Sequence, residues 1–269
     1  MMWNPPWALP AVLPLGLLPA REAQLLWLAA NLLAAGWCGD RLWVRYAGDP
    51  ARRWVGWAAA LGFVPTLFAL QSGQVGPLLL LGAVLFLEAE RRGWYAVAGA
   101  ATVLLAVKPH LAYLVWAAVA CDAVARRRWA VLAGGAAAGA VATLLPLALN
   151  PHVVAQYADA MGNRPPDQWV SPTLGTVLRL VSFVTAPYGA WPFDLVLLLP
   201  AVVRLLAGGA PRAVVAGLVA VNLACLVMNV LQTGSFPFLW VAPALLGLYA
   251  AGMDRPAARP AAAPVGAAA

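Results

Sequence analysis

The chain has 269 residues, of which 63% are hydrophobic and 10% are charged, and its mean hydropathy is +0.80. A soluble domain carries about 45–50% apolar and about 25% charged residues, so this composition excludes both a soluble globular protein and a disordered chain. The formal net charge is +7, from 17 basic and 10 acidic residues, and a basic surplus in so apolar a chain is first a signal of membrane topology. The sequence predicts an all-α, polytopic transmembrane helical bundle.

The chain begins with a proline-rich apolar segment and continues in long apolar stretches. Five prolines fall within the first 19 residues, which excludes a regular helix, so we expect an irregular segment at the outer membrane face. A spanning helix needs about 20 mostly apolar residues, and fewer where its ends are wet or covered by neighbours. We expect nine spans, at 22–38, 54–70, 75–90, 94–108, 110–125, 129–149, 193–207, 212–231 and 236–252.

Basic residues in the connecting loops set the orientation. With the N-terminus outside and the C-terminus inside, nine spans place 13 basic residues on the inner side and four on the outer side, as the positive-inside rule requires. This count requires residues 150–192 to form one extracytoplasmic excursion with a re-entrant or interfacial helix. We therefore expect a multi-pass plasma-membrane protein, with a transmembrane module at 1–253 and a disordered cytoplasmic tail at 254–269.

Polar side chains are expensive at membrane depth, and the first group of them forms the expected outer turn at 71–74. Gln71 and Gln74 could face a cavity and donate hydrogen bonds to a sugar. The alternative is an ordinary polar hairpin at the membrane edge.

The second group is Lys108, Pro109 and His110, between two expected spans. Pro109 suits the first position of the following helix, and a helix N-terminus together with an ammonium and an imidazole predicts a phosphate site. The alternative is a lysine whose ammonium reaches the headgroups from the membrane interface. We favour the phosphate site because Lys108 is the chain's only lysine, whereas arginine occurs 16 times.

The third group lies in the expected outer excursion. Arg164 and Arg179 are candidates for the same phosphate site, although Arg179 could instead reach the headgroups as an anchor. Gln168 and Ser171 are candidates for sugar or acceptor binding. Asp159 and Asp167 are candidate catalytic bases, with solvated loop charges as the alternative.

Several other chemistries are excluded by missing motifs. The chain has no G-x-S-x-G, Walker or H-E-x-x-H motif, only two histidines, and no soluble stretch long enough for a nucleotide-binding domain. Its three cysteines lie in apolar runs without metal-ligand spacing, and no carboxylate cluster suggests a divalent cation. We expect no metal, no cofactor and no nucleic-acid partner.

The run FALQSGQVGPLLLLGAVLFLEAERRGWYAVAGAATVLLAVKPHLAYLVW resembles the core of glycosyltransferase family 87. The matching elements are a G-Q turn (Gly73-Gln74), a Leu-rich span, a short basic loop (Arg91-Arg92) and a span ending in K-P (Lys108-Pro109). The later pattern of an amide and a serine before a helix ending in arginine resembles Gln168, Ser171 and Arg179, and the proline-rich start is also similar. The resemblance covers about residues 3–250.

This resemblance implies a membrane-embedded mannosyltransferase of the GT-C superfamily that uses a polyprenyl-phosphate sugar and a glycan or glycolipid acceptor. In the family, a first helix and an outer loop with the acidic catalytic base precede the proline-rich segment. This chain begins after that point, so the base is not carried over, and we expect a fragment, a split enzyme or an inactive remnant as alternatives to an active module. A lipid or sugar-lipid transporter without catalysis is the alternative from another functional class.

Overall fold

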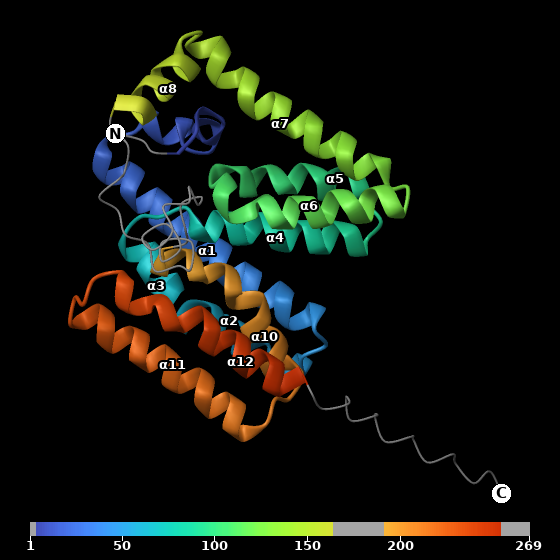
Figure 1. Ribbon diagram of the computed structural model, residues 1–269, viewed down its shortest axis with the longest axis vertical. Coiled ribbons are helices and arrows are strands. Elements are labelled where there is room, and N and C mark those ends of the chain that lie inside the picture. The colour runs from blue at the N-terminus through green and yellow to red at the C-terminus, as the bar shows by residue number, and fades with distance from the viewer. Residues whose placement is uncertain (1–3, 164–190, 254–269) are drawn as a thin grey trace, which may run out of the picture.

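The structure, a computed structural model, describes residues 4–163 and 191–253, and every regular element in those ranges is a helix (Figure 1). The α-helices are α1 (Ala20–Arg45), α2 (Arg53–Gly62), α3 (Val64–Gln71), α4 (Gly76–Arg91), α5 (Tyr95–Ala101), α6 (Pro109–Ala125), α7 (Trp129–Leu149), α8 (Val153–Asn163), α10 (Leu199–Ala207), α11 (Arg212–Val230) and α12 (Val241–Met253). Six 3-10 helices accompany them within these ranges: η1 (Pro6–Ala11), η2 (Leu13–Leu17), η3 (Pro50–Arg52), η4 (Thr102–Val107), η5 (Pro192–Leu198) and η6 (Phe236–Trp240). The all-α prediction is confirmed for this part of the chain.

The expectation of nine spans is wrong by helix length and composition. Among the described residues, three helical segments are long and apolar enough to cross a membrane, at Trp129–Leu149, Arg212–Val230 and Phe236–Met253. A fourth is obtained if Pro50–Gly62 and Val64–Gln71, which meet at an angle of 53°, count as one broken span.

The other expected spans fail this criterion because their helices are short, broken or polar. The stretch at 94–108 divides into α5 and η4, and the stretch at 193–207 divides into η5 and α10. Prolines begin both η5 and α10, and proline cannot continue an α-helix. Helix α1 is long enough, but it carries Gln24, Asn31 and Asp40 within its apolar sequence.

The proline-rich start forms the short helices η1 and η2, in keeping with the irregular segment that its prolines predict. Trp7 anchors it, because the indole Nε1 donates a hydrogen bond of 2.7 Å to the carbonyl oxygen of Ala106. Ala8 is buried in a small apolar cluster with Leu105 and Val107. The start of the chain therefore packs beside the residues that lead into Lys108.

The two ends of the bundle differ in chemistry. The connections that carry Arg52, Arg91 and Arg127 lie at the right in Figure 1, whereas the turn after α3 and the start of α6 lie toward the left. Ion pairs hold the arginine-rich end: Arg53 donates two hydrogen bonds to Asp40, and Arg128 donates one to Glu90. Several arginines therefore lie at the end of the fold opposite to the 71–74 turn.

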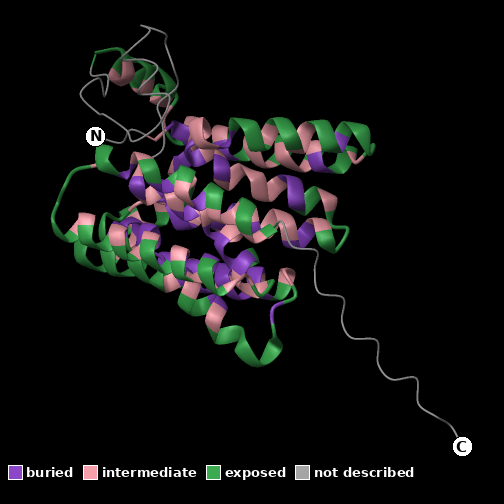
Figure 2. Cartoon of the chain, turned by 60° about the horizontal axis from the view of Figure 1, so that its bottom comes forward, coloured by how far each residue is buried: buried purple, intermediate pink, exposed green. Residues whose placement is uncertain are grey.

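Packing is tightest where small residues let helices approach. A Cβ atom on Gly99 of α5 would collide with the backbone of Val131 in α7, and one on Gly134 of α7 would collide with Ala96 in α5. Such small-residue contacts are typical of helices that associate in membranes. Figure 2 shows buried residues on the inner faces of the helices and exposed residues along the outer ones, where α11 exposes Val219, Leu223 and Val227.

The break between α2 and α3 is stabilised by a side chain from α11. Asn222 Oδ1 accepts a hydrogen bond of 2.7 Å from the backbone N–H of Val64, and its Nδ2 donates one of 2.9 Å to the carbonyl oxygen of Gly62. A broken helix frees backbone groups that must be satisfied away from water. Asn222 satisfies one group on each side of the break and so fixes the direction in which α3 leads to the 71–74 turn.

We expect Asn222→Leu to lower the free energy of unfolding by about 1–3 kcal/mol, because it leaves the backbone N–H of the buried residue Val64 without a partner. Thermal unfolding in detergent measures the change. Asn222→Asp, which keeps the acceptor and loses the donor, should fall between the wild type and the leucine variant. Equal unfolding temperatures for the wild type and Asn222→Leu would show that the clamp contributes nothing.

Candidate functional site

Three segments far apart in sequence bring polar side chains together at the end of the bundle opposite to the arginine-rich connections. Lys108 lies between η4 and α6, Gln74 follows α3, and Asp194 lies in η5. The ammonium Nζ of Lys108 is 2.6 Å from Oδ1 of Asp194 and donates a longer hydrogen bond of 3.4 Å to Oε1 of Gln74. The ammonium also lies 4.5 Å from the centre of the Phe193 ring, within range of a cation–π contact.

Local sequence explains why each partner is held in place. Pro109 begins α6, and Lys108 is the residue that caps it. Pro192 begins η5, and the second carboxylate oxygen of Asp194, Oδ2, accepts a hydrogen bond of 3.0 Å from the backbone N–H of Trp191. Both oxygens of Asp194 are therefore occupied, one by the helix start and one by the ammonium.

The Lys108–Asp194 ion pair is buried. The side chain of Lys108 is 8% exposed and that of Asp194 is 0% exposed. Two charges can be buried together because each compensates the other, but removing one partner of such a pair typically costs about 3–5 kcal/mol. The lysine that the sequence singles out is thus held by a carboxylate that the sequence analysis does not include among the candidate site residues.

His110 lies in the first turn of α6, half-buried, and close enough to sense the charges of both Asp194 and Lys108. The first N–H groups of an α-helix have no partner inside the helix and carry a partial positive charge. The imidazole, the helix start and the ammonium therefore share one location.

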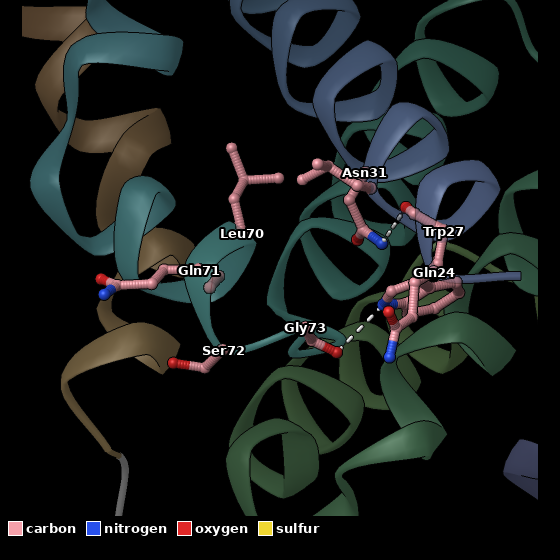
Figure 3. Close-up of a pocket in the computed structure, with 9 residues that line it drawn as sticks. Gln24, Trp27, Asn31, Leu70, Gln71, Ser72 and Gly73 are labelled. Atoms are coloured by element: carbon pink, nitrogen blue, oxygen red, sulfur yellow. Dashed lines mark hydrogen bonds between the residues drawn. The ribbon is translucent and has the colours of Figure 1, made fainter. Parts of the chain in front are cut away.

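A cavity of about 410 Å³ lies on the other side of the 71–74 turn, between that turn and α1 (Figure 3). The indole Nε1 of Trp27 donates a hydrogen bond of 2.9 Å to the carbonyl oxygen of Gly73, which holds the turn against α1. The cavity is lined by uncharged residues, which are Gln24, Trp27, Leu28, Asn31, Ala69, Leu70, Gln71, Ser72 and Gly73.

The predicted site residues divide into three groups. Gln74, Lys108 and His110 lie together, and Gln71 lines the cavity on the far side of the same turn. Asp159 is exposed on α8 and accepts a hydrogen bond of 2.6 Å from Asn163 of the same helix. The others, Arg164, Asp167, Gln168, Ser171 and Arg179, lie outside the described residues.

Sequence reasoning missed Asp194 and the two amides of α1, Gln24 and Asn31. Asp194 lies within the apolar span expected at 193–207. A lone carboxylate inside such a stretch nevertheless indicates a polar site, because it needs a buried partner. Gln24 and Asn31 fall within the first expected span and carry the same signal. Among the described residues, no three His, Cys, Asp or Glu side chains come together as metal ligands would.

Comparison with known proteins identifies a family. The family model described as "Glycosyltransferase family 87" matches residues 3–231, which is most of the chain. No curated protein and no solved structure matches the chain.

Proposed function

Because the chain belongs to glycosyltransferase family 87, a family of membrane glycosyltransferases, we propose that it transfers a hexose, namely mannose, from a polyprenyl-phosphate sugar. The acceptor is a glycan or glycolipid at the extracytoplasmic face of the plasma membrane. In this proposal the N-terminus lies outside, the C-terminus lies inside, and the end of the bundle that holds Lys108 faces outward.

The observation that carries the proposal is the convergence of Lys108, His110 and Gln74 at the start of α6. A polyprenyl-phosphate sugar carries one phosphodiester charge, and a helix start beside cationic side chains suits a phosphate. Lys108 and His110 bind this phosphate, and Arg164 and Arg179 complete its surroundings. Gln71, Gln74, Gln168 and Ser171 are the proposed contacts to sugar and acceptor hydroxyls.

In the proposed reaction, an acceptor hydroxyl attacks the anomeric carbon of the donor sugar and the bond to the phosphate oxygen breaks. The bonding electrons leave with the polyprenyl phosphate, whose developing charge is stabilised by the ammonium of Lys108 and by the start of α6. A carboxylate takes the hydroxyl proton, and Asp159 and Asp167 are the candidates for it within this chain. Asp194 is unsuited to that role, because its side chain is fully buried and both oxygens already accept hydrogen bonds.

Donor binding and sugar transfer by the chain in lipid nanodiscs test the proposal. We expect radiolabelled polyprenyl-phosphate-mannose to bind saturably and to label a glycolipid acceptor, while GDP-mannose at the same concentration does neither. Binding of the nucleotide sugar in place of the lipid donor would overturn the donor class. Saturable binding of the lipid donor without any labelled acceptor would overturn the transfer step.

A further inference from the structure

We propose that the cavity between α1 and the 71–74 turn binds a neutral pyranose ring of a substrate, separately from the phosphate at Lys108. The inference deepens the proposed function and rests on it for the identity of the substrates. It assigns a binding role to Asn31, Gln24 and Trp27, which the sequence does not single out.

The described wall of the cavity favours a neutral ligand over a charged one. All of its lining residues are uncharged, whereas an anion such as phosphate is bound by cations or helix N-termini. The wall instead offers the carboxamides of Gln24 and Asn31, whereas the polar ends of Gln71 and Ser72 point away from α1 (Figure 3). A carboxamide both donates and accepts hydrogen bonds, which matches the hydroxyl groups around a sugar ring.

Asn31 gives the most specific sign of a ligand. The residue is only 4% exposed, and its Nδ2 donates a hydrogen bond of 2.9 Å to the carbonyl oxygen of Trp27 one turn earlier. Within the described part of the chain its Oδ1 accepts no hydrogen bond, and Figure 3 shows that oxygen on the side of the carboxamide facing the 71–73 turn. An acceptor that is open to the cavity receives its hydrogen bond from a ligand or from water, and a sugar hydroxyl supplies that donor.

The cavity and the phosphate site share one structural element. Gln74 meets Lys108 on one side of the turn, and Gln71 and Ser72 line the cavity on the other. Trp27 holds the turn against α1 through its bond to Gly73, and Asn229 of α11 donates a long hydrogen bond of 3.4 Å to Oε1 of Gln71. The volume of about 410 Å³ lies within the range typical of small-molecule sites.

The experiment measures binding of three neutral probes, the methyl glycosides of mannose, glucose and galactose, to the chain in detergent by saturation-transfer NMR. We expect at least one to bind the wild type, and Asn31→Leu and Gln24→Leu each to weaken that binding by about tenfold. The matched control is Gln156→Leu, an exposed glutamine on α8 that does not line the cavity. It should bind the probe as the wild type does.

A competition arm distinguishes the two sources of the pyranose. If the ring belongs to the donor, polyprenyl-phosphate-mannose displaces the glycoside, whereas polyprenyl phosphate alone does not. If the ring belongs to the acceptor, the glycoside still binds when the donor is present.

The inference fails if none of the three glycosides binds the wild type, or if the leucine variants at Asn31 and Gln24 bind as the wild type does. Glycoside binding that depends on Asn31, together with no use of the lipid donor, would instead overturn the proposed function and leave the cavity assignment standing.

Discussion

The double variant Lys108→Met/Asp194→Asn is expected to fold and insert like the wild type but to transfer sugar about 10²–10³-fold more slowly. Methionine fills the space of the lysine stem without charge, and asparagine keeps an acceptor for the Trp191 N–H that Asp194 Oδ2 now satisfies. Both buried charges are removed together, so no uncompensated charge remains. What is lost is the cation that, in the proposed function, stabilises the departing phosphate.

Initial rates of transfer from polyprenyl-phosphate-mannose, beside thermal unfolding of the same preparations, test this result. Arg126→Ala is the control, because Arg126 forms an exposed pair with Asp122 at the arginine-rich end of the bundle. It should retain wild-type transfer. A double variant that is stable and fully active would show that the Lys108–Asp194 pair is purely structural and that the phosphate is bound elsewhere.

Asp194→Ala alone should lower the free energy of unfolding by about 3–5 kcal/mol, because it leaves the ammonium of Lys108 buried without its partner. It also removes the acceptor of the Trp191 N–H at the start of η5. Adding Lys108→Met to this variant should restore part of the stability, since the unpaired charge is then gone. Asp159→Ala, on an exposed residue of α8, serves as a control for loss of a carboxylate and should unfold like the wild type.

Unfolding temperatures of the wild type, Asp194→Ala, Lys108→Met and the double variant, measured in the same detergent, give the coupling between Lys108 and Asp194. A single Asp194→Ala variant as stable as the wild type would mean that the lysine finds another partner. Equal decreases of the unfolding temperature in Asp194→Ala and in the double variant would mean that the hydrogen bond from the Trp191 N–H to Asp194, and not the ion pair, stabilises η5.

The sequence predicts the all-α class and the position of Lys108, His110 and Gln74 because these depend on local patterns. Apolar stretches separated by basic loops indicate helices and their alternating ends, and a lone K-P-H between two such stretches indicates a polar helix start. The number of full spans is not fixed in the same way, because prolines at 65, 192 and 200 divide apolar stretches into short helices. Hydropathy alone does not register those breaks.

The contacts that sequence reasoning misses are long-range. Asp194 is separated from Lys108 by 86 residues, and Asn222 is separated from the backbone that it clamps by 158 and 160 residues. Each is a single polar residue inside an apolar stretch, so its presence signals a buried partner without saying which one. Only the packing of the helices identifies that partner.

The hydrogen bonds of Asn222 connect the exposed apolar surface of α11 to the wall of the cavity. Helix α11 exposes apolar side chains along its length, and the same helix holds both sides of the α2–α3 break and contacts Gln71. A tilt of α11 imposed by a thinner or thicker bilayer would therefore displace α3 and reshape the space beside Asn31. For the sugar site proposed there, the thickness of the surrounding membrane would thus be a physical variable of binding.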